Sequence, residues 1–198
     1  MVAVGNIMHA DFALVQRAKA QDRAAFNEIV LRYKSKVYNY IFRQVGSASD
    51  AEDLTQETFV RAYLSINSFQ SRASLNTWLF RIATNLCIDQ GRKNQRTRSF
   101  LAPPVREDED SVDQDIPDSS FDPQILALNS ELGVKLEAAL RSLPEKLRTV
   151  ILLYDVEGLS YDEISGILDC PLGTIKSRIF NARSALREKL APYLQSVV

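Results

Sequence analysis

The segment 171–187 carries polar and cationic residues whose types and spacing suit contact with double-stranded DNA. At about 100° per residue, Ser177, Asn181 and Ser184 fall on one side of a helix, opposite a line of aliphatic residues. Short polar side chains in such a position reach base edges in the major groove, and flanking cations reach phosphates on the groove walls. Over residues 170–189, five basic residues stand against one acid. The predicted contacts with duplex DNA are Thr174, Lys176, Ser177, Arg178, Phe180, Asn181 and Arg183.

The residues before this segment must position it, and their pattern is that of a helix-turn-helix. A helix is predicted over about 160–168, followed by a break at Asp169, Cys170 and Pro171. Pro171 suits the first position of the second helix, where its missing N–H is not needed. The second helix of such a pair is the one that enters the major groove. Two alternatives stay open: the polar face is merely solvated, or Phe180 packs on a neighbouring helix.

The rest of the C-terminal block is also predicted to be helical. A helix beginning near Pro144 is rich in leucine and valine and should form the core, and a helix over about 124–142 completes a four-helix domain. Apolar residues recur at spacings of three and four on both halves of the chain, with almost no alternation. Ser-x-x-Glu patterns predict helix N-termini at Ser49, Ser142 and Ser160.

A predicted helix over about 50–64 carries an acidic stripe that suits a protein partner rather than DNA. The opposite side of this helix is formed by Ala51, Leu54, Thr58 and Ala62. The stripe itself consists of Asp53, Gln56, Glu57 and Val60. On the residues alone, a solvated helix face is the alternative.

The next segment combines a polar loop, 67–76, with a helix suited to holding an unpaired base. Arg81 and Asn85 share one face of this helix and Trp78 adjoins them. An amide, a guanidinium and a nearby loop can hold an unstacked base by its hydrogen-bonding edge; for Trp78, core packing is the alternative. The basic run 92–98 suits backbone phosphates, with a solubilising helix end as its alternative. The predicted contacts with single-stranded DNA are Trp78, Arg81, Asn85, Arg92 and Lys93.

The net charge of −1 hides three unlike segments. Residues 1–98 hold 14 basic against 8 acidic residues, a net of +6, whereas residues 99–123 hold one basic against 8 acidic residues, a net of −7. Residues 124–198 balance 9 against 9. Prolines, serines and acids in the middle segment favour a solvated linker, with a merely passive tether as its alternative. The sequence therefore predicts an all-α chain of two small helical domains joined by an acidic flexible linker.

Several kinds of chemistry are not expected. Cys87 and Cys170 are far apart and His9 is the single histidine, so we predict no metal, cofactor or disulfide, while a redox role for the cysteines stays open. The acids of 107–115 lack the pattern of a calcium loop, and no nucleophile–base pair is evident, so no enzyme activity is predicted. Without an apolar run of about 20 residues, a cytoplasmic protein with no membrane insertion is expected. Met8 is a second candidate start.

Three motifs in order resemble bacterial extracytoplasmic-function (ECF) sigma factors of the sigma-70 family. They are SDAEDLTQETFVRAY at 49–63, NSFQSRASLNTWLFRIATNLCIDQGRK at 67–93 and CPLGTIKSRIFNAR at 170–183. The first two are similar to the second conserved region of these proteins and the third to the fourth region. The resemblance covers about 11–95 and 124–192.

The resemblance implies roles for several of these residues. Asp53, Gln56 and Glu57 would bind the clamp helices of the largest subunit of RNA polymerase. Asn85 and the loop around Phe69 would capture a flipped base of the minus-ten element on the non-template strand. The C-terminal domain would bind the polymerase flap and read the minus-thirty-five duplex, while the linker would pass through the RNA exit path.

By the same resemblance, the chain would be an alternative sigma factor that binds RNA polymerase core and directs promoter-specific initiation. An anti-sigma factor is implied as a further partner. Similar sigma factors often carry Arg where this chain has Asn181, so a promoter preference does not carry over. The alternative is a stand-alone helix-turn-helix regulator that binds duplex DNA without polymerase and needs no acidic stripe.

Overall fold

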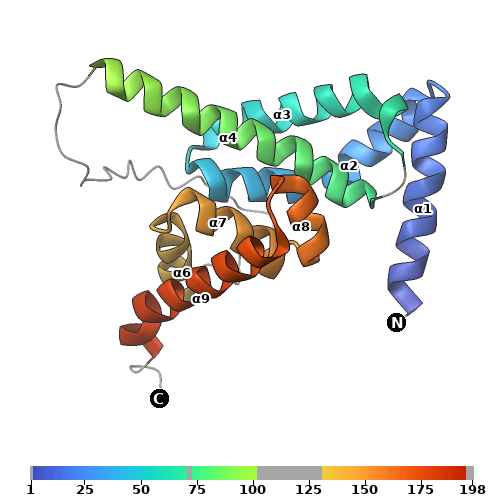
Figure 1. Cartoon of the computed structure of the whole chain (residues 1–198). Helices are drawn as coiled ribbons and strands as arrows, with labels where there is room; N and C mark the ends of the chain where they lie inside the picture. Colours follow the sequence, from blue (N-terminus) through green and yellow to red (C-terminus); the bar gives the residue numbers. More distant parts are fainter. Residues whose placement is uncertain (1, 71–72, 102–130, 195–198) are drawn as a thin grey trace.

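The computed structural model describes residues 2–70, 73–101 and 131–194, with side chains over 11–70, 73–96 and 133–193. Every regular element in these ranges is helical, which confirms the all-α prediction. In the described ranges we find no helix with the length and apolar character that crossing a bilayer would need. In chain order (Figure 1) the elements are α1 Val2–Lys19, α2 Arg23–Val45, α3 Ala48–Ser65, the 3₁₀ turn η1 Ile66–Ser68, α4 Leu75–Leu101, α6 Glu131–Arg141, α7 Glu145–Ile151, the π-helix η2 Leu152–Val156, α8 Tyr161–Leu168 and α9 Leu172–Leu194.

The N-terminal domain is a bundle in which α2 lies against α1, α3 and α4. Val37 and Ile41 of α2 and Phe80 of α4 are fully buried in its core. The Asp22 carboxylate caps α2 by accepting two backbone N–H groups. Gly46 ends α2 with a φ of 78°, a left-handed conformation that favours glycine and lets the chain turn directly into α3.

The C-terminal domain packs α6, α7 and α8 against α9. Helix α9 buries Ile175, Ile179 and Ala182 against these neighbours. Between α8 and α9, Asp169 takes a left-handed φ of 49°, and Pro171 directly precedes α9, so its missing N–H costs no helical hydrogen bond. The predicted helix-turn-helix is therefore present, with the turn at the predicted residues.

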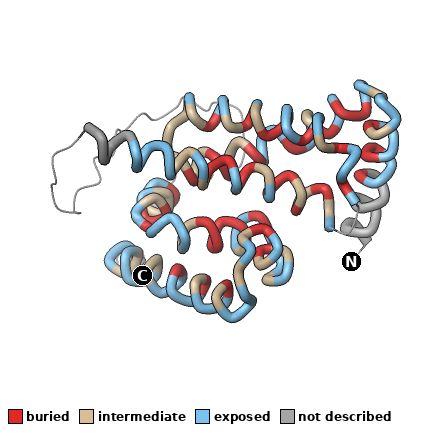
Figure 2. Tube along the Cα trace, turned by 45° about the horizontal axis from the view of Figure 1, so that its top comes forward, coloured by how far each residue is buried: buried red, intermediate tan, exposed pale blue. Residues whose placement is uncertain are grey.

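The two domains lie against each other, which the sequence did not predict. Helix α2 contacts α6 and α7, and α4 contacts α8 (Figure 1). Figure 2 shows that buried residues line both sides of this contact, while the outer faces of the helices are exposed. The predicted boundaries of 1–98, 99–123 and 124–198 can be compared only in part. Helix α4 continues to Leu101, and residues 102–130 lie outside the described ranges.

Only one of the three Ser-x-x-Glu patterns caps a helix. Ser160 accepts from the Glu163 N–H while the Glu163 carboxylate accepts from the Ser160 N–H, so this capping box is confirmed. The other two predictions were wrong. Helix α3 is capped by Ser47, which places Ser49 inside its first turn, and α7 begins after Pro144 without a side-chain cap. The Ser142 hydroxyl instead donates to a carbonyl at the end of α6.

This difference can be tested by two substitutions. Ser160→Ala should lower the free energy of unfolding by about 1 kcal/mol, because it removes the acceptor of an orphan amide at the start of α8. Ser49→Ala should leave the free energy of unfolding unchanged, since the cap of α3 is Ser47. Urea unfolding followed by circular dichroism measures both. Equal losses for the two variants would contradict the cap assignment.

Candidate nucleic-acid interface

Helix α9 presents the predicted duplex contacts to solvent because its opposite face is buried. Ile175 and Ile179 are at most 3% exposed, whereas the ring of Phe180 is 72% exposed. An exposure of this size leaves little of the ring in contact with a neighbouring helix, so the packing alternative for Phe180 does not hold here. Among the other predicted contacts, Lys176, Ser177, Asn181 and Arg183 are exposed, and Thr174 and Arg178 are half-buried.

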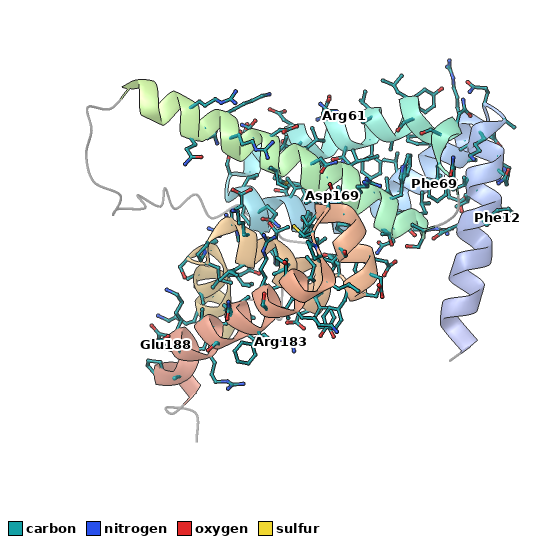
Figure 3. The ribbon with its side chains drawn as sticks, viewed as in Figure 1. Phe12, Arg61, Phe69, Asp169, Arg183 and Glu188 are labelled. Atoms are coloured by element: carbon teal, nitrogen blue, oxygen red, sulfur yellow. The ribbon has the colours of Figure 1, made fainter. Side chains whose placement is uncertain are left out.

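Two cations of α9 are held by residues from outside the helix. Arg183, labelled in Figure 3, donates from Nε to Asp155 Oδ2 at 3.0 Å and from Nη2 to Asp155 Oδ1. Its guanidinium carbon lies 5.2 Å from the Tyr154 ring centroid. Tyr154 in turn stacks on Tyr161, with centroids 4.7 Å apart and planes 5° apart, and Lys176 Nζ lies 5.8 Å from the Tyr161 ring. The hydrogen bonds that Arg183 donates to Asp155 raise the pKa of the guanidinium.

This cluster was not predicted from the sequence. Tyr154 and Asp155 belong to the π-helix η2, whose wider turn is closed by the Glu157 N–H donating to the Leu152 carbonyl at 3.0 Å. The turn at 157–160 separates Tyr154 from Tyr161, so no helical periodicity relates the two positions. A sequence pattern therefore could not have predicted that these two rings stack. The Asp155–Arg183 ion pair is exposed, so solvent screens it and it contributes little to stability. Its effect is to orient the guanidinium.

The acidic stripe on α3 has the predicted geometry. Asp53 and Gln56 are exposed, and Val60 is 52% exposed. Glu57 accepts from Arg61 Nε at 2.7 Å, one turn further along the helix. On the other side of α3 the buried residues are Ala51, Thr55, Thr58, Phe59 and Ala62. The stripe is therefore a solvent-facing surface on a helix whose opposite side is buried.

Asn85 lies at the rim of a cavity of about 340 Å³ between α3 and α4. Leu64 and Ile82 supply apolar side chains that suit the faces of a base, while Asn85 and Arg61 supply hydrogen-bonding groups that suit its edge. Arg61 and Leu64 were not singled out in the sequence. Arg81, predicted to act with Asn85, is exposed and does not line this cavity.

A second cavity of about 250 Å³ shares Arg61 with the first. Its lining is strongly basic. It includes Arg61, which is labelled in Figure 3, together with Arg92, Lys93 and Arg96. Arg92 lies 3.7 Å from the Asp89 carboxylate but stays 70% exposed, so it can still reach an anion. The predicted phosphate-binding run thus adjoins the cavity at Asn85. The side chains of 97 and 98 lie outside the described residues.

Phe69 and Trp78 anchor the loop that precedes α4. The Phe69 ring is only 7% exposed and lies 5.0 Å from the Trp78 ring, centroid to centroid. Lys19 of α1 donates to the Phe69 carbonyl oxygen at 2.5 Å. In this conformation the Phe69 ring offers little surface to a base, and its predicted contact with DNA stays a prediction. For Trp78, half-buried against the core, the packing alternative is the one observed.

This geometry defines a two-domain, helix-turn-helix DNA-binding protein. Residues 29–97 match the family model Sigma-70 region 2, and residues 133–186 match Sigma-70, region 4. The ECF RNA polymerase sigma-E factor of Haemophilus influenzae is 41% identical over 190 residues, which cover 93% of this chain and 97% of that protein. The corresponding sigma-E factor of Escherichia coli K12 is 37% identical over 195 residues. The chain therefore belongs to the sigma-70 family of RNA polymerase sigma factors.

Two solved structures are similar in fold to this chain. The sigma factor RpoE in complex with the anti-sigma factor NepR from Bartonella quintana is 28% identical, with a TM-score of 0.64 over 84% of this chain and 96% of that one. CnrH in complex with the cytosolic domain of CnrY is similar in fold, with a TM-score of 0.65 over 92% of this chain and 98% of that one.

The different positions of the two phenylalanines give a direct test of the interface. Phe69→Ala should lower the free energy of unfolding by about 3 kcal/mol, because it empties a buried site. Phe180→Ala should leave the free energy of unfolding unchanged and weaken binding of the protein to promoter duplex. Urea unfolding and fluorescence anisotropy with a labelled duplex measure the two effects. A large loss of stability in Phe180→Ala would place this ring in the core instead.

Proposed function

We propose that the chain is an alternative sigma factor that directs promoter-specific initiation by reading the minus-thirty-five duplex with α9 and holding the melted minus-ten strand at α3 and α4. One observation carries the proposal. A solvent-facing polar face on a helix-turn-helix occurs in the same chain as two adjoining cavities on a second domain, one with apolar side chains and Asn85 and the other basic. The proposed role needs no catalytic residue of the chain itself and places its action in the cytoplasm, with RNA polymerase.

Opening of the minus-ten region is driven by binding energy. A captured base that leaves the stack is stabilised by about 1–3 kcal/mol through contact with side-chain surfaces. Leu64 and Ile82 provide such surface, Asn85 and Arg61 recognise the edge of the base, and the neighbouring basic cavity holds the backbone. Because these groups bind an unpaired base better than a stacked one, they shift the equilibrium toward the melted state.

Recruitment to RNA polymerase is assigned to the acidic stripe of α3. Asp53, Gln56 and Val60 combine charge, hydrogen-bonding groups and an apolar contact on one exposed face. We assign this face to the clamp helices of the largest subunit, and the C-terminal domain to the flap. An anti-sigma factor is a further proposed partner, supported by the solved sigma factor RpoE above, which is in complex with the anti-sigma factor NepR.

Run-off transcription with purified core enzyme tests the proposed function. Adding the chain to core should create initiation at a cognate promoter, and Gln56→Ala should reduce it several-fold by weakening recruitment. As a control, Glu52→Ala changes an exposed residue of the same helix outside the stripe and should keep most of the activity. Tight duplex binding by the free chain with no effect on core enzyme would support the stand-alone regulator instead.

The division of labour between the domains gives a second test. Asn85→Ala should leave the affinity for minus-thirty-five duplex unchanged but reduce permanganate-detected opening of the minus-ten region. Lys176→Ala should weaken duplex binding across sequences, because a lysine on the flank of α9 contacts phosphate rather than a base edge. If Asn85→Ala also abolished duplex binding, the separate roles of the two domains would be incorrect.

A further inference from the structure

The polar face of α9 carries a stripe of short side chains on which Asn181 reaches furthest. At about 100° per residue, Gly173, Ser177, Asn181 and Ser184 fall within about 80° of arc, opposite the buried line of the helix. A Cβ built on Gly173 would meet nothing within 4 Å in the described chain, so packing inside the protein does not require a glycine there. Short side chains let the helix backbone approach a binding surface closely. Asn181 has the longest side chain of the four and extends beyond the others.

Two neighbours of Asn181 on α9 use their hydrogen-bonding groups inside the protein. The Ser177 hydroxyl donates to the Thr174 carbonyl oxygen at 3.0 Å, so its single hydrogen is already used. Arg178 is half-buried, and its Nη1 donates to Cys170 Sγ at 3.5 Å. Both contacts leave these side chains less able to donate to a ligand in front of α9.

The cations beside the stripe are held at its flanks. Arg183 is paired with Asp155, and Lys176 lies beside the Tyr161 ring. A cation held at the edge of a helix face reaches the phosphates on a groove wall rather than the base edges between the walls. These two cations therefore orient α9 on a duplex without selecting its sequence.

The Asn181 amide differs from these groups because no other part of the described chain uses it. The side chain is exposed, and within the described residues it makes no hydrogen bond. Its planar end presents an acceptor oxygen and an NH₂ donor side by side. Ser184 is also exposed, but a hydroxyl can rotate to donate or to accept and therefore distinguishes bases poorly.

Adenine is the base whose edge matches this amide. In the major groove adenine presents its N7 acceptor next to its N6 donor, so an amide can bond both atoms at once. Guanine presents two acceptors, cytosine a donor, and thymine an acceptor beside a methyl group, so none of these bases offers the same pair. The adjoining Phe180 ring is 72% exposed and suits the methyl group of a thymine. Both side chains therefore fit an A·T pair better than a G·C pair.

We propose that Asn181 selects an adenine in the minus-thirty-five duplex through paired hydrogen bonds to N6 and N7. The choice of base follows from the exposed amide and its neighbours on α9, whereas placing that base in a promoter rests on the proposed function. A good amide–adenine pair discriminates roughly 5- to 100-fold against another base at the same position. Asn181 then sets the preference at one position, while the flanking cations contribute affinity for every sequence.

The test is initiation by core enzyme with the full-length chain on a promoter library whose minus-thirty-five region is randomised. With the parent, sequencing of the run-off products should show adenine favoured roughly 5- to 100-fold at one position of one strand. Asn181→Ala should remove that preference and leave the other positions as they were. As a matched control, Ser184→Ala changes the same stripe and should keep the adenine preference. A parent without such a position, or an Asn181→Ala variant that keeps every adenine preference, would overturn the proposal.

Exchange of the side chain and of single atoms of the base tests the hydrogen bonds themselves. Asn181→Arg should move the preference to guanine, because a guanidinium donates to both O6 and N7, and Asn181→Asp should move it toward cytosine, whose N4 donates. Replacing the selected adenine by 7-deazaadenine, which lacks the N7 acceptor, should weaken initiation by the parent several-fold and leave Asn181→Ala unaffected. Equal losses in these two proteins, or an equal gain on all sequences in Asn181→Arg, would overturn the amide–adenine pair.

Two controls separate this proposal from folding and from the function on which it rests. Because Asn181 is exposed, its variants should keep the parent's free energy of unfolding in urea, so a changed preference is not a folding defect. If the parent directs no initiation from any member of the library, the proposed function fails. Selection of randomised duplexes by the full-length chain alone then decides the base preference. Enrichment of adenine that is lost in Asn181→Ala supports the pair, whereas no enrichment, or enrichment that does not depend on Asn181, overturns it.

Discussion

The packing of α2 is the interaction on which the remaining structure depends. Its buried side chains hold α1, α3 and α4 together, and its second half also contacts α6 and α7. The rigid support that α2 gives to α3 and α4 sets the width of the space between those helices. The cavity at Asn85 and the exposed stripe of α3 are therefore both results of burial elsewhere, because a helix fixed on one face can present the other in a constant orientation.

The polar groups at the centre of the molecule link stability to conformational change. Tyr40 and Gln44 are buried, and each can keep its partner within the N-terminal domain when α7 moves away. The carboxylates of Glu137 and Glu157 differ, because their cationic partners lie on the other domain. A contact made of ionic pairs is more easily exchanged for water than an apolar one, since charges separated from each other regain hydration. Such a contact suits domains that separate without unfolding.

The sequence predicted the helices and the exposed surfaces well, because both depend on the periodicity of apolar and polar residues that are close in the chain. The stripe of α3, the buried line of Ile175, Ile179 and Ala182, and the turn at Asp169 all follow from residues close in the chain. The burial of Phe69 was missed because Lys19 and Trp78 reach it from separate elements. The docking of the domains and the Asp155–Arg183 pair depend on three-dimensional contacts that have no local period, so no pattern in one sequence could have revealed them.

The carboxylate beside Arg183 also affects how binding to DNA responds to ionic strength. A cation that is bare in solution displaces a condensed counter-ion when it meets a phosphate, and the entropy of that ion favours association. Arg183 already forms an ion pair with Asp155, so on binding a phosphate it exchanges one anionic partner for another. It therefore releases fewer counter-ions than an unpaired cation would. The number of counter-ions released by α9 should therefore be smaller than its number of lysines and arginines. Direct contacts with bases then contribute a larger share of its affinity.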